Sequence, residues 1–137
     1  MNIISTKAHA ILDYALVLLL FLSPRLFKLM DYSDTNPAVW IVPSSIAVLI
    51  ASSAVMTDYE GGLFRWLPMQ FHLYADLALG FILAISPWLF GFADFAFFPH
   101  LIIGVVIIIT SMLTKKRTVY PVAREPREPF IYKSEKL

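Results

Sequence analysis

The sequence contains no cysteine among its 137 residues, which excludes disulfides, thiolate zinc sites, iron–sulfur ligation and cysteine nucleophiles. Charge is scarce: Asp, Glu, Lys and Arg make up 15% of the chain, whereas soluble domains carry about 25%. Glycine is limited to 5 residues, which argues against a glycine-rich disordered or collagenous chain. Apolar residues are abundant instead, at 58%, and the mean hydropathy is +0.71, so the composition predicts a membrane protein.

Four segments are long and apolar enough to span a bilayer, which takes about 20 mostly apolar residues. Uncharged stretches of 23 and 20 residues lie between positions 34 and 58 and between positions 94 and 115. Two further apolar stretches are each interrupted by a single carboxylate, Asp13 or Asp76. We therefore predict spans over residues 8–27, 38–56, 69–90 and 99–114.

The distribution of basic residues sets the expected orientation, because Lys and Arg concentrate on the cytoplasmic side. With four spans both termini share a side, and that side holds nine Lys and Arg residues, including Lys7 and Arg65. The opposite side holds only Arg25 and Lys28. We expect both termini in the cytoplasm.

The end of the chain, residues 115–137, differs in composition from the spans. It contains seven basic and three acidic residues together with three prolines, so it neither spans nor forms a long helix. We expect a cytoplasmic tail that contacts the lipid bilayer through anionic headgroups, with a specific lipid or protein partner as the alternative. The net charge of the whole chain, +1, gives no case for nucleic-acid binding.

The chain contains an internal repeat. A shift of 63 positions superposes the first and third spans, and a shift of 61 superposes the second and fourth. Because each unit has two spans, the copies share one orientation, and we expect a pseudo-twofold axis along the membrane normal. The fold prediction is thus an all-α transmembrane four-helix bundle of two tandem helical hairpins. The matched residues of the first and third spans are His9 and His72, Asp13 and Asp76, Leu16 and Leu79, Ser23-Pro24 and Ser86-Pro87, and Leu26-Phe27 and Leu89-Phe90.

The repeated Ser-Pro pair has a backbone explanation. Pro24 and Pro87 remove the hydrogen bonds to the carbonyls of Leu20 and Leu83, which need other partners inside a bilayer. The preceding serine hydroxyls supply such donors, so we predict a kink or a helix end there. Trp88 follows the second pair and is expected to anchor the helix at the interface. The motif thus comprises Ser23, Pro24, Ser86, Pro87 and Trp88.

The stretch from Ser86 to Phe92, following Gly80, resembles the signature of the SPW-repeat family of small bacterial membrane proteins. The resemblance covers roughly residues 5 to 115 and includes the connecting pattern from Thr57 to Gly62. It implies two transmembrane helices per repeat, with the signature in the first, and a location in the bacterial inner membrane, but no particular activity. The first unit departs from the signature, since Arg25 replaces the tryptophan.

A polar cluster is expected on the cytoplasmic side. Within each His-Asp pair the two residues are four positions apart, so they share a helix face near the start of their span. The connection between the units adds further charges on the same side, and among them Arg65 is the expected counter-ion for an aspartate. Ionisable groups within a membrane are a functional-site hypothesis by default. The predicted cluster is His9, Asp13, Asp58, Glu60, Arg65, His72 and Asp76.

Several roles are open for this cluster. It could lock the helices together as an ion-pair network, or handle protons or a small ligand. Zn, Mn or Fe bound by His and Asp is another role, as is haem held between His9 and His72. His100 has no counterpart in the other repeat and is expected at the opposite interface.

The sequence divides into a first hairpin (residues 1–57), a cytoplasmic connection (58–68), a second hairpin (69–114) and the tail (115–137). No P-loop, dinucleotide fingerprint or Gly-x-Ser-x-Gly elbow is present, so we assign no catalytic residue, no metal ligand and no cofactor. We favour a non-enzymatic accessory or scaffold protein, with a membrane-protein partner or a second copy of the chain. The alternative is a membrane protein that handles a small ligand, protons, a metal or a cofactor at the His/Asp cluster.

Overall fold

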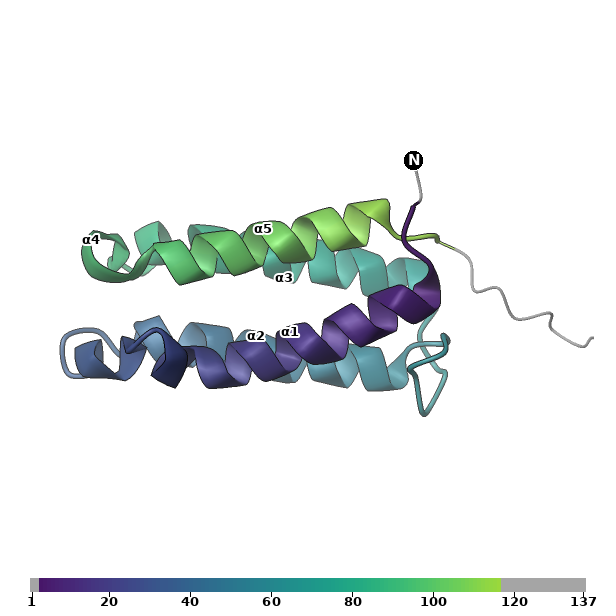
Figure 1. Cartoon of the computed structure of the whole chain (residues 1–137), viewed down its shortest axis with the longest axis horizontal. Helices are drawn as coiled ribbons and strands as arrows, with labels where there is room; N and C mark the ends of the chain where they lie inside the picture. Colours follow the sequence, from purple (N-terminus) through teal and green to yellow (C-terminus); the bar gives the residue numbers. More distant parts are fainter. Residues whose placement is uncertain (1–2, 117–137) are drawn as a thin grey trace, which may run out of the picture.

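The computed structural model describes residues 3–116, and this part of the chain is a helical bundle (Figure 1). Its long helices are α1 (Thr6–Leu26), α2 (Ala38–Met56) and α3 (Met69–Leu89), and α5 (Phe98–Leu113) is a shorter apolar helix. Two one-turn elements, η1 (Leu29–Tyr32) and α4 (Ala93–Ala96), lie between them. Strands are absent from residues 3–116, so the all-α prediction is confirmed. The tail beyond residue 116 lies outside the described residues.

The helices agree with the predicted spans to within two residues at every end. α1, α2 and α3 are long and apolar enough to cross a membrane. α5 has 16 residues and rises about 24 Å, somewhat less than the ~30 Å hydrocarbon core. Prolines mark three of the starts, at or next to the first helical residue, where a missing N–H is not needed. α1 begins instead with a cap, in which the Ser5 hydroxyl accepts from the Ala8 N–H at 3.2 Å.

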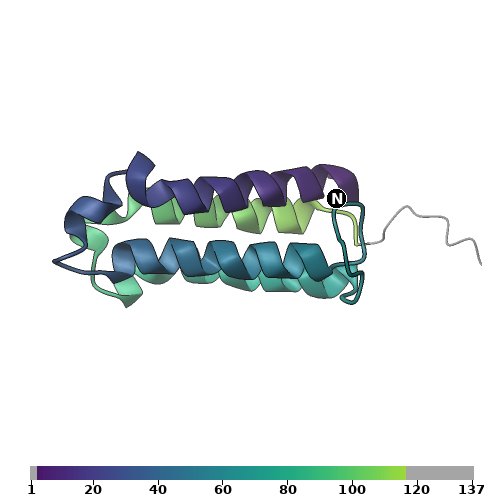
Figure 2. The same cartoon turned by 90° about the horizontal axis from the view of Figure 1, so that it is seen from below.

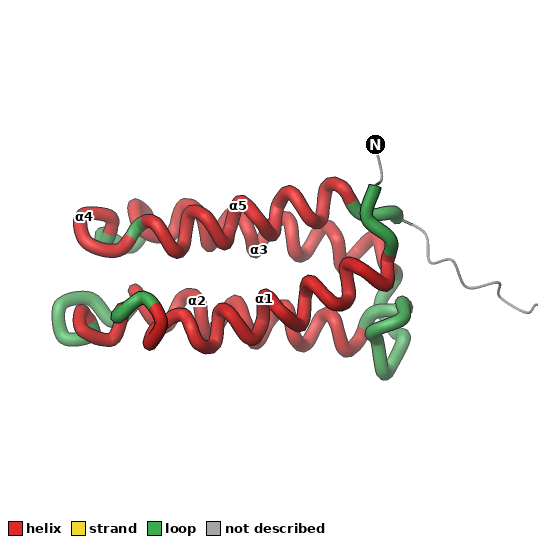
Figure 3. Tube along the Cα trace, viewed as in Figure 1, coloured by secondary structure: helices red, strands yellow, loops and turns green. Residues whose placement is uncertain are grey.

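Consecutive helices pair into two hairpins, α1 with α2 and α3 with α5 (Figures 1 and 2). The loops are confined to the two ends of the bundle (Figure 3). At one end, isolated bridges join Ile4 to Thr114 and Thr57 to Leu67, so the start of the chain, the α2–α3 connection and the end of α5 lie together. We call this the connection end; η1 and α4 lie at the opposite end.

In the second hairpin, α3 and α5 cross so closely at Gly80 and Gly104 that a side chain at either position would collide with the other helix. A Cβ at Gly104 would lie 2.6 Å from the carbonyl oxygen of Gly80 and 2.7 Å from the backbone nitrogen of Ala84. Glycine at this crossing lets the backbones of α3 and α5 touch, as small residues do in membrane helix pairs.

The interior and the outer face of the bundle are both apolar. Outward-facing side chains such as Ile11, Leu18 and Phe81 are more than half exposed, which is the surface expected of a protein surrounded by lipid. The main internal cluster lies midway along the helices and comprises Leu16, Leu20, Ile46, Ala47, Ile50, Leu83, Ile103 and Ile107.

Both Ser-Pro pairs lie in the last turn of their helices. Ser23 Oγ donates to the carbonyl of Leu20 at 2.7 Å, and Ser86 Oγ donates to that of Leu83 at 2.8 Å. These are the two carbonyls that the prolines deprive of a partner. α1 and α3 continue through the prolines and end two residues later, so the pair terminates each helix. Trp88 is 57% exposed, as an interfacial anchor would be.

Candidate functional site

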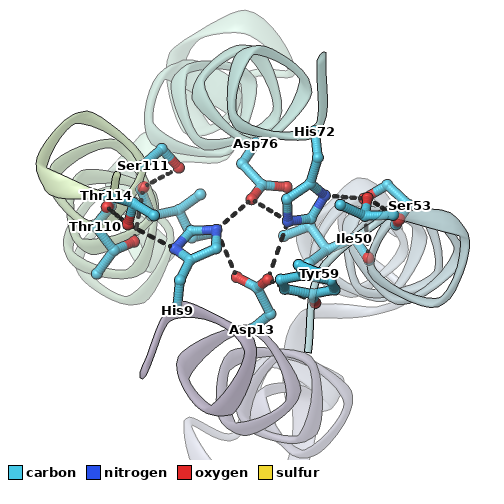
Figure 4. A network of polar contacts seen from close by, with 12 residues as sticks. His9, Asp13, Ile50, Ser53, Tyr59, His72, Asp76, Thr110, Ser111 and Thr114 are labelled. Atoms are coloured by element: carbon cyan, nitrogen blue, oxygen red, sulfur yellow. Dashed lines mark hydrogen bonds and ion pairs between the residues drawn. The ribbon is translucent and has the colours of Figure 1, made fainter. Parts of the chain in front are cut away.

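Two histidines and two aspartates meet inside the bundle, in the first two turns from the connection end (Figure 4). α1 contributes His9 and Asp13, and α3 contributes His72 and Asp76. Seen down the bundle, α1 and α3 lie opposite one another, with α2 and α5 on the two flanks. The four side chains therefore bridge the diagonal of the bundle. We call these four residues the His/Asp centre.

The imidazoles and carboxylates alternate around a ring. His9 Nε2 lies 3.4 Å from Asp13 Oδ1 and 3.3 Å from Asp76 Oδ2. His72 Nε2 lies 3.0 Å from Asp13 Oδ2 and 3.2 Å from Asp76 Oδ2. Each Nε2 thus faces two carboxylates, one from its own helix and one from the helix across the bundle.

The His/Asp centre is closed to solvent. The exposed fraction is 0% for His9 and His72, 3% for Asp13 and 1% for Asp76. The two imidazole rings meet edge to face, with centroids 5.4 Å apart. One atom lacks a partner, because Asp76 Oδ1 is buried without a hydrogen bond. Four ionisable groups buried this fully require charge compensation within the centre.

The other ring nitrogen of each histidine contacts a hydroxyl from a flanking helix. Thr114 Oγ1, at the end of α5, lies 3.0 Å from His9 Nδ1, and Ser53 Oγ on α2 lies 3.2 Å from His72 Nδ1. Each hydroxyl belongs to the hairpin that does not contain its histidine. Sequence reasoning missed both residues, although the shift of 61 positions that relates α2 to α5 places Ser53 on Thr114.

The α2–α3 connection covers the His/Asp centre. Tyr59 is fully buried, and its hydroxyl donates to Asp13 Oδ2 at 3.2 Å. Burial, and then the charge of Asp13, raises the pKa of Tyr59, so the phenol keeps the proton that it donates. The connection is held to α1 by a second tyrosine, because Tyr14 donates to the carbonyl of Gly61 at 2.8 Å. Tyr59 was also missed by sequence reasoning; its signal is an aromatic residue within a polar, glycine-containing connection.

Three predicted cluster residues of the connection lie around the centre rather than in it. Asp58 is exposed, and Glu60 is half-buried, with a buried Oε2 that lacks a hydrogen bond. Arg65 has an exposed side chain and a left-handed backbone, with φ 51°. Ion pairs within the described residues join Asp13 and Asp76 to the imidazoles of His9 and His72.

His100 lies in the first turn of α5, near the opposite end, and its side chain is buried inside the bundle. Its exposed fraction is 1%, and its ring nitrogens lie 3.0 Å from the carbonyl oxygens of Ala96 and Val39. The imidazole therefore joins α5 to the start of α2 near the opposite end.

The His/Asp centre can act chemically in two ways. It can hold protons between imidazoles and carboxylates, or it can hold a cation, since its four ligand atoms lie within 4.8 Å of one another. Nucleophilic or general acid–base chemistry on a substrate would need access that the burial of these groups does not give.

Comparison with known proteins gives one match. The family model of the SPW repeat domain matches residues 7–114. No curated protein and no solved structure was found to match the chain. The matched range runs from the first turn of α1 to Thr114, so it includes the whole His/Asp centre and both hydroxyls around it.

Proposed function

Because the chain belongs to the SPW repeat family and its apolar helices are those of a membrane protein, we propose that it is a non-enzymatic scaffold or accessory protein of the bacterial inner membrane. The observation that supports this role is the closed His/Asp centre, whose reactive groups contact one another rather than an open site. A centre of this kind stabilises the bundle and sets the positions of its helices.

The exchange of partners between hairpins supports the two-repeat arrangement with a pseudo-twofold axis. His9 takes its hydroxyl from the second hairpin, and His72 takes its hydroxyl from the first. Each aspartate likewise contacts one histidine from each hairpin. The centre therefore joins the hairpins to each other, whereas the apolar core alone specifies this pairing only by shape.

The proposed orientation places the connection end in the cytoplasm. That end carries Lys7, Arg65, Lys115 and Lys116, and the basic residues of the tail follow it in the sequence. The loop at the other end combines two basic residues with acidic ones. The positive-inside rule thus supports cytoplasmic termini, and the basic tail would then contact anionic headgroups.

Reporter fusions test this orientation. A periplasmic reporter fused after Asp34 or Asp94 is expected to be active, and the same reporter fused at Leu137 is expected to be inactive. A cytoplasmic reporter at the same three positions is the matched control and should give the opposite pattern. Cytoplasmic activity after Asp34 would refute the orientation.

Purification at native expression level tests the scaffold role. The expected result is a stoichiometric membrane-protein partner, or a second copy of the chain, in mild detergent by mass spectrometry. The proposal would be contradicted if the purified protein is a monomer and crosslinking in intact membranes also captures no partner.

Handling of protons or a small ligand by the His/Asp centre is the second candidate function, and the unpartnered Asp76 Oδ1 favours it. The Asp76→Asn variant distinguishes a structural centre from one that handles protons or a ligand. If the centre locks the helices, the free energy of unfolding in detergent should fall by about 3–5 kcal/mol, because one half of a buried pair is lost. A working site would instead lose its proton- or ligand-dependent signal with little change in stability.

A further inference from the structure

The hydroxyls that flank the His/Asp centre determine which ring nitrogen of each histidine carries a proton. A serine or threonine hydroxyl has a single proton to donate. Ser53 Oγ gives that proton to the carbonyl of Ile50 at 3.0 Å, and Thr114 Oγ1 gives its proton to the carbonyl of Thr110 at 2.6 Å. Both hydroxyl oxygens must therefore accept from the neighbouring Nδ1–H of His72 and His9.

This assignment leaves both Nε2 atoms turned toward carboxylates. A neutral imidazole with Nδ1–H has a lone pair at Nε2. With neutral rings and ionised carboxylates, two lone pairs would face the carboxylate oxygens at 3.0–3.4 Å, and the centre would carry two uncompensated negative charges. Such a buried charge is prohibitively costly. That charge is compensated either by two protons shared between the Nε2 atoms and the carboxylates or by one divalent cation.

The distances favour a cation. A hydrogen bond between an imidazolium and a carboxylate is about 2.7–2.9 Å long, whereas the two hydrogen bonds found here, His72 Nε2 to Asp13 Oδ2 and His9 Nε2 to Asp76 Oδ2, are 3.0 and 3.3 Å long. Each Nε2 also lies between two oxygens instead of pointing at one. Around a tetrahedral ion with ligands at about 2.0–2.1 Å, neighbouring ligand atoms are about 3.3–3.4 Å apart. With Oδ2 of Asp13 and Oδ2 of Asp76 as the oxygens, three N···O separations of 3.0–3.3 Å are close to that spacing. All four ligand atoms of such a set lie within 4.8 Å of one another.

Two further observations fit the same ion. Histidines that bind a metal through one nitrogen bond a polar group through the other, and here both Nδ1 atoms contact hydroxyls. Protons on Nε2 would leave Asp76 Oδ1 without a partner, whereas a carboxylate bound to an ion can bring its second oxygen into the coordination sphere. Imidazole and carboxylate together suit first-row transition metals better than Mg²⁺ or Ca²⁺.

We propose that the His/Asp centre binds one divalent transition-metal ion, with Nε2 of His9 and His72 and a carboxylate oxygen of Asp13 and of Asp76 as the ligands. The ion fastens α1 to α3 across the bundle, and the α2–α3 connection closes over it through Tyr59. The inference rests on the closed centre of the proposed function and names what fills it. The sequence analysis left a metal as one open role of the cluster and assigned no metal ligand, because the spacing of the residues along the chain does not give the distances between their ligand atoms.

Metal analysis of the full-length protein tests the proposal. The chain is purified in mild detergent with a non-histidine tag and without chelator, and its metal content is measured by plasma mass spectrometry. About one ion per chain is expected. Asp76→Asn and His72→Gln should lose the ion, whereas Asp58→Asn, which removes an exposed carboxylate at the same end, should retain it. Equal metal content in all variants would mean binding elsewhere and would overturn the proposal.

A second measurement keeps the test decisive if the variants fail to fold. The unaltered protein is stripped with chelator and refilled with Zn²⁺, and Co²⁺ is used as an optical probe. The Tm should fall on stripping and recover on refilling, and Co²⁺ should give the visible absorption of a four-coordinate site. Folded protein that takes up neither ion would overturn the proposal.

These outcomes separate the metal site from the scaffold role. A metal-free centre whose Asp76→Asn variant is still destabilised would leave the helix lock standing, filled by protons, and would refute the metal. A bound ion in a protein that has no partner would refute the scaffold role and leave the metal site standing.

Discussion

The two hydroxyls that contact the histidines provide a test of the His/Asp centre that leaves its charges intact. Ser53→Ala removes the acceptor for His72 Nδ1–H, which lies 3.2 Å away, while changing the side-chain volume little. The ring nitrogen would then be buried without a partner, which costs about 1–3 kcal/mol. Hydrogen bonds between helices in membranes average about 0.6 kcal/mol, with a maximum near 1.7 kcal/mol. We therefore expect a loss of about 1–2 kcal/mol.

The neighbouring serine is a matched control. Ser52 donates to the carbonyl of Val48 on its own helix, as Ser53 does to that of Ile50, but its side chain is exposed on the outer face. Ser52→Ala should change the free energy of unfolding by no more than about 0.5 kcal/mol. The assay is denaturant unfolding in detergent micelles followed by circular dichroism. Equal effects of Ser52→Ala and Ser53→Ala would refute the reasoning.

The second hydroxyl gives the same comparison in the other hairpin. Thr114→Val, which is nearly isosteric, should match Ser53→Ala, with Thr110→Val as the control that removes only bonds within α5. Because both hydroxyls act on one centre, the double variant should show an interaction energy of about 0.5 kcal/mol or more. If the centre holds a metal, each single variant should also weaken its affinity about 10- to 100-fold. If the free-energy changes of the two single variants simply add in the double variant, the two histidines do not form one unit.

Three other changes test the surroundings of the centre. Tyr59→Phe removes the bond to the Asp13 carboxylate and should cost about 1.5–3 kcal/mol. Because the folded state raises the pKa of Tyr59, the stability that this tyrosine contributes is fully present below its ordinary pKa of 10.0 and declines as the pH rises above that value. The free energy of unfolding of Tyr59→Phe, measured at increasing alkaline pH, should not show this decline. Gly62→Ala would drive a Cβ into the backbone carbonyl of Thr57, and hydrogen exchange should show an opened connection. Gly104→Ala would force α5 away from the backbone of α3, and thermal unfolding in detergent should occur at lower temperature.

The helices could be predicted closely because lipid leaves the chain few options. A segment inside a bilayer must satisfy its backbone groups internally, so the gaps between charges define helices almost directly. Proline and serine then mark where α1 and α3 end. The internal repeat of the sequence also predicted that His9 and His72 lie close together, since equivalent residues of two parallel units are expected at the same depth. The two rings are in contact in the structure.

The partners of the His/Asp centre could not be predicted in the same way. Ser53 and Thr114 lie in apolar helices, where a hydroxyl usually bonds its own backbone, and both do so here in addition to contacting a histidine. Tyr59 depends on how the connection folds back, which no periodicity encodes. Arg65 was chosen as counter-ion because it carries a permanent charge. The ion pairs found in the centre are with imidazoles, whose charge depends on what they bind.

The exchange of residues between hairpins explains why the centre needs both hairpins. Each hairpin alone supplies one histidine, one aspartate and a hydroxyl that points to the histidine of the other hairpin. Half of the centre would leave a carboxylate with one imidazole and a ring nitrogen without its acceptor, both buried in the bundle, where unsatisfied polar groups cost about 1–3 kcal/mol or more. Apolar packing between α1, α2, α3 and α5 has no comparable penalty for a changed pairing, because lipid is as apolar as the helix surfaces. The His/Asp centre therefore supplies the specificity that hydrophobic contacts cannot supply in a bilayer.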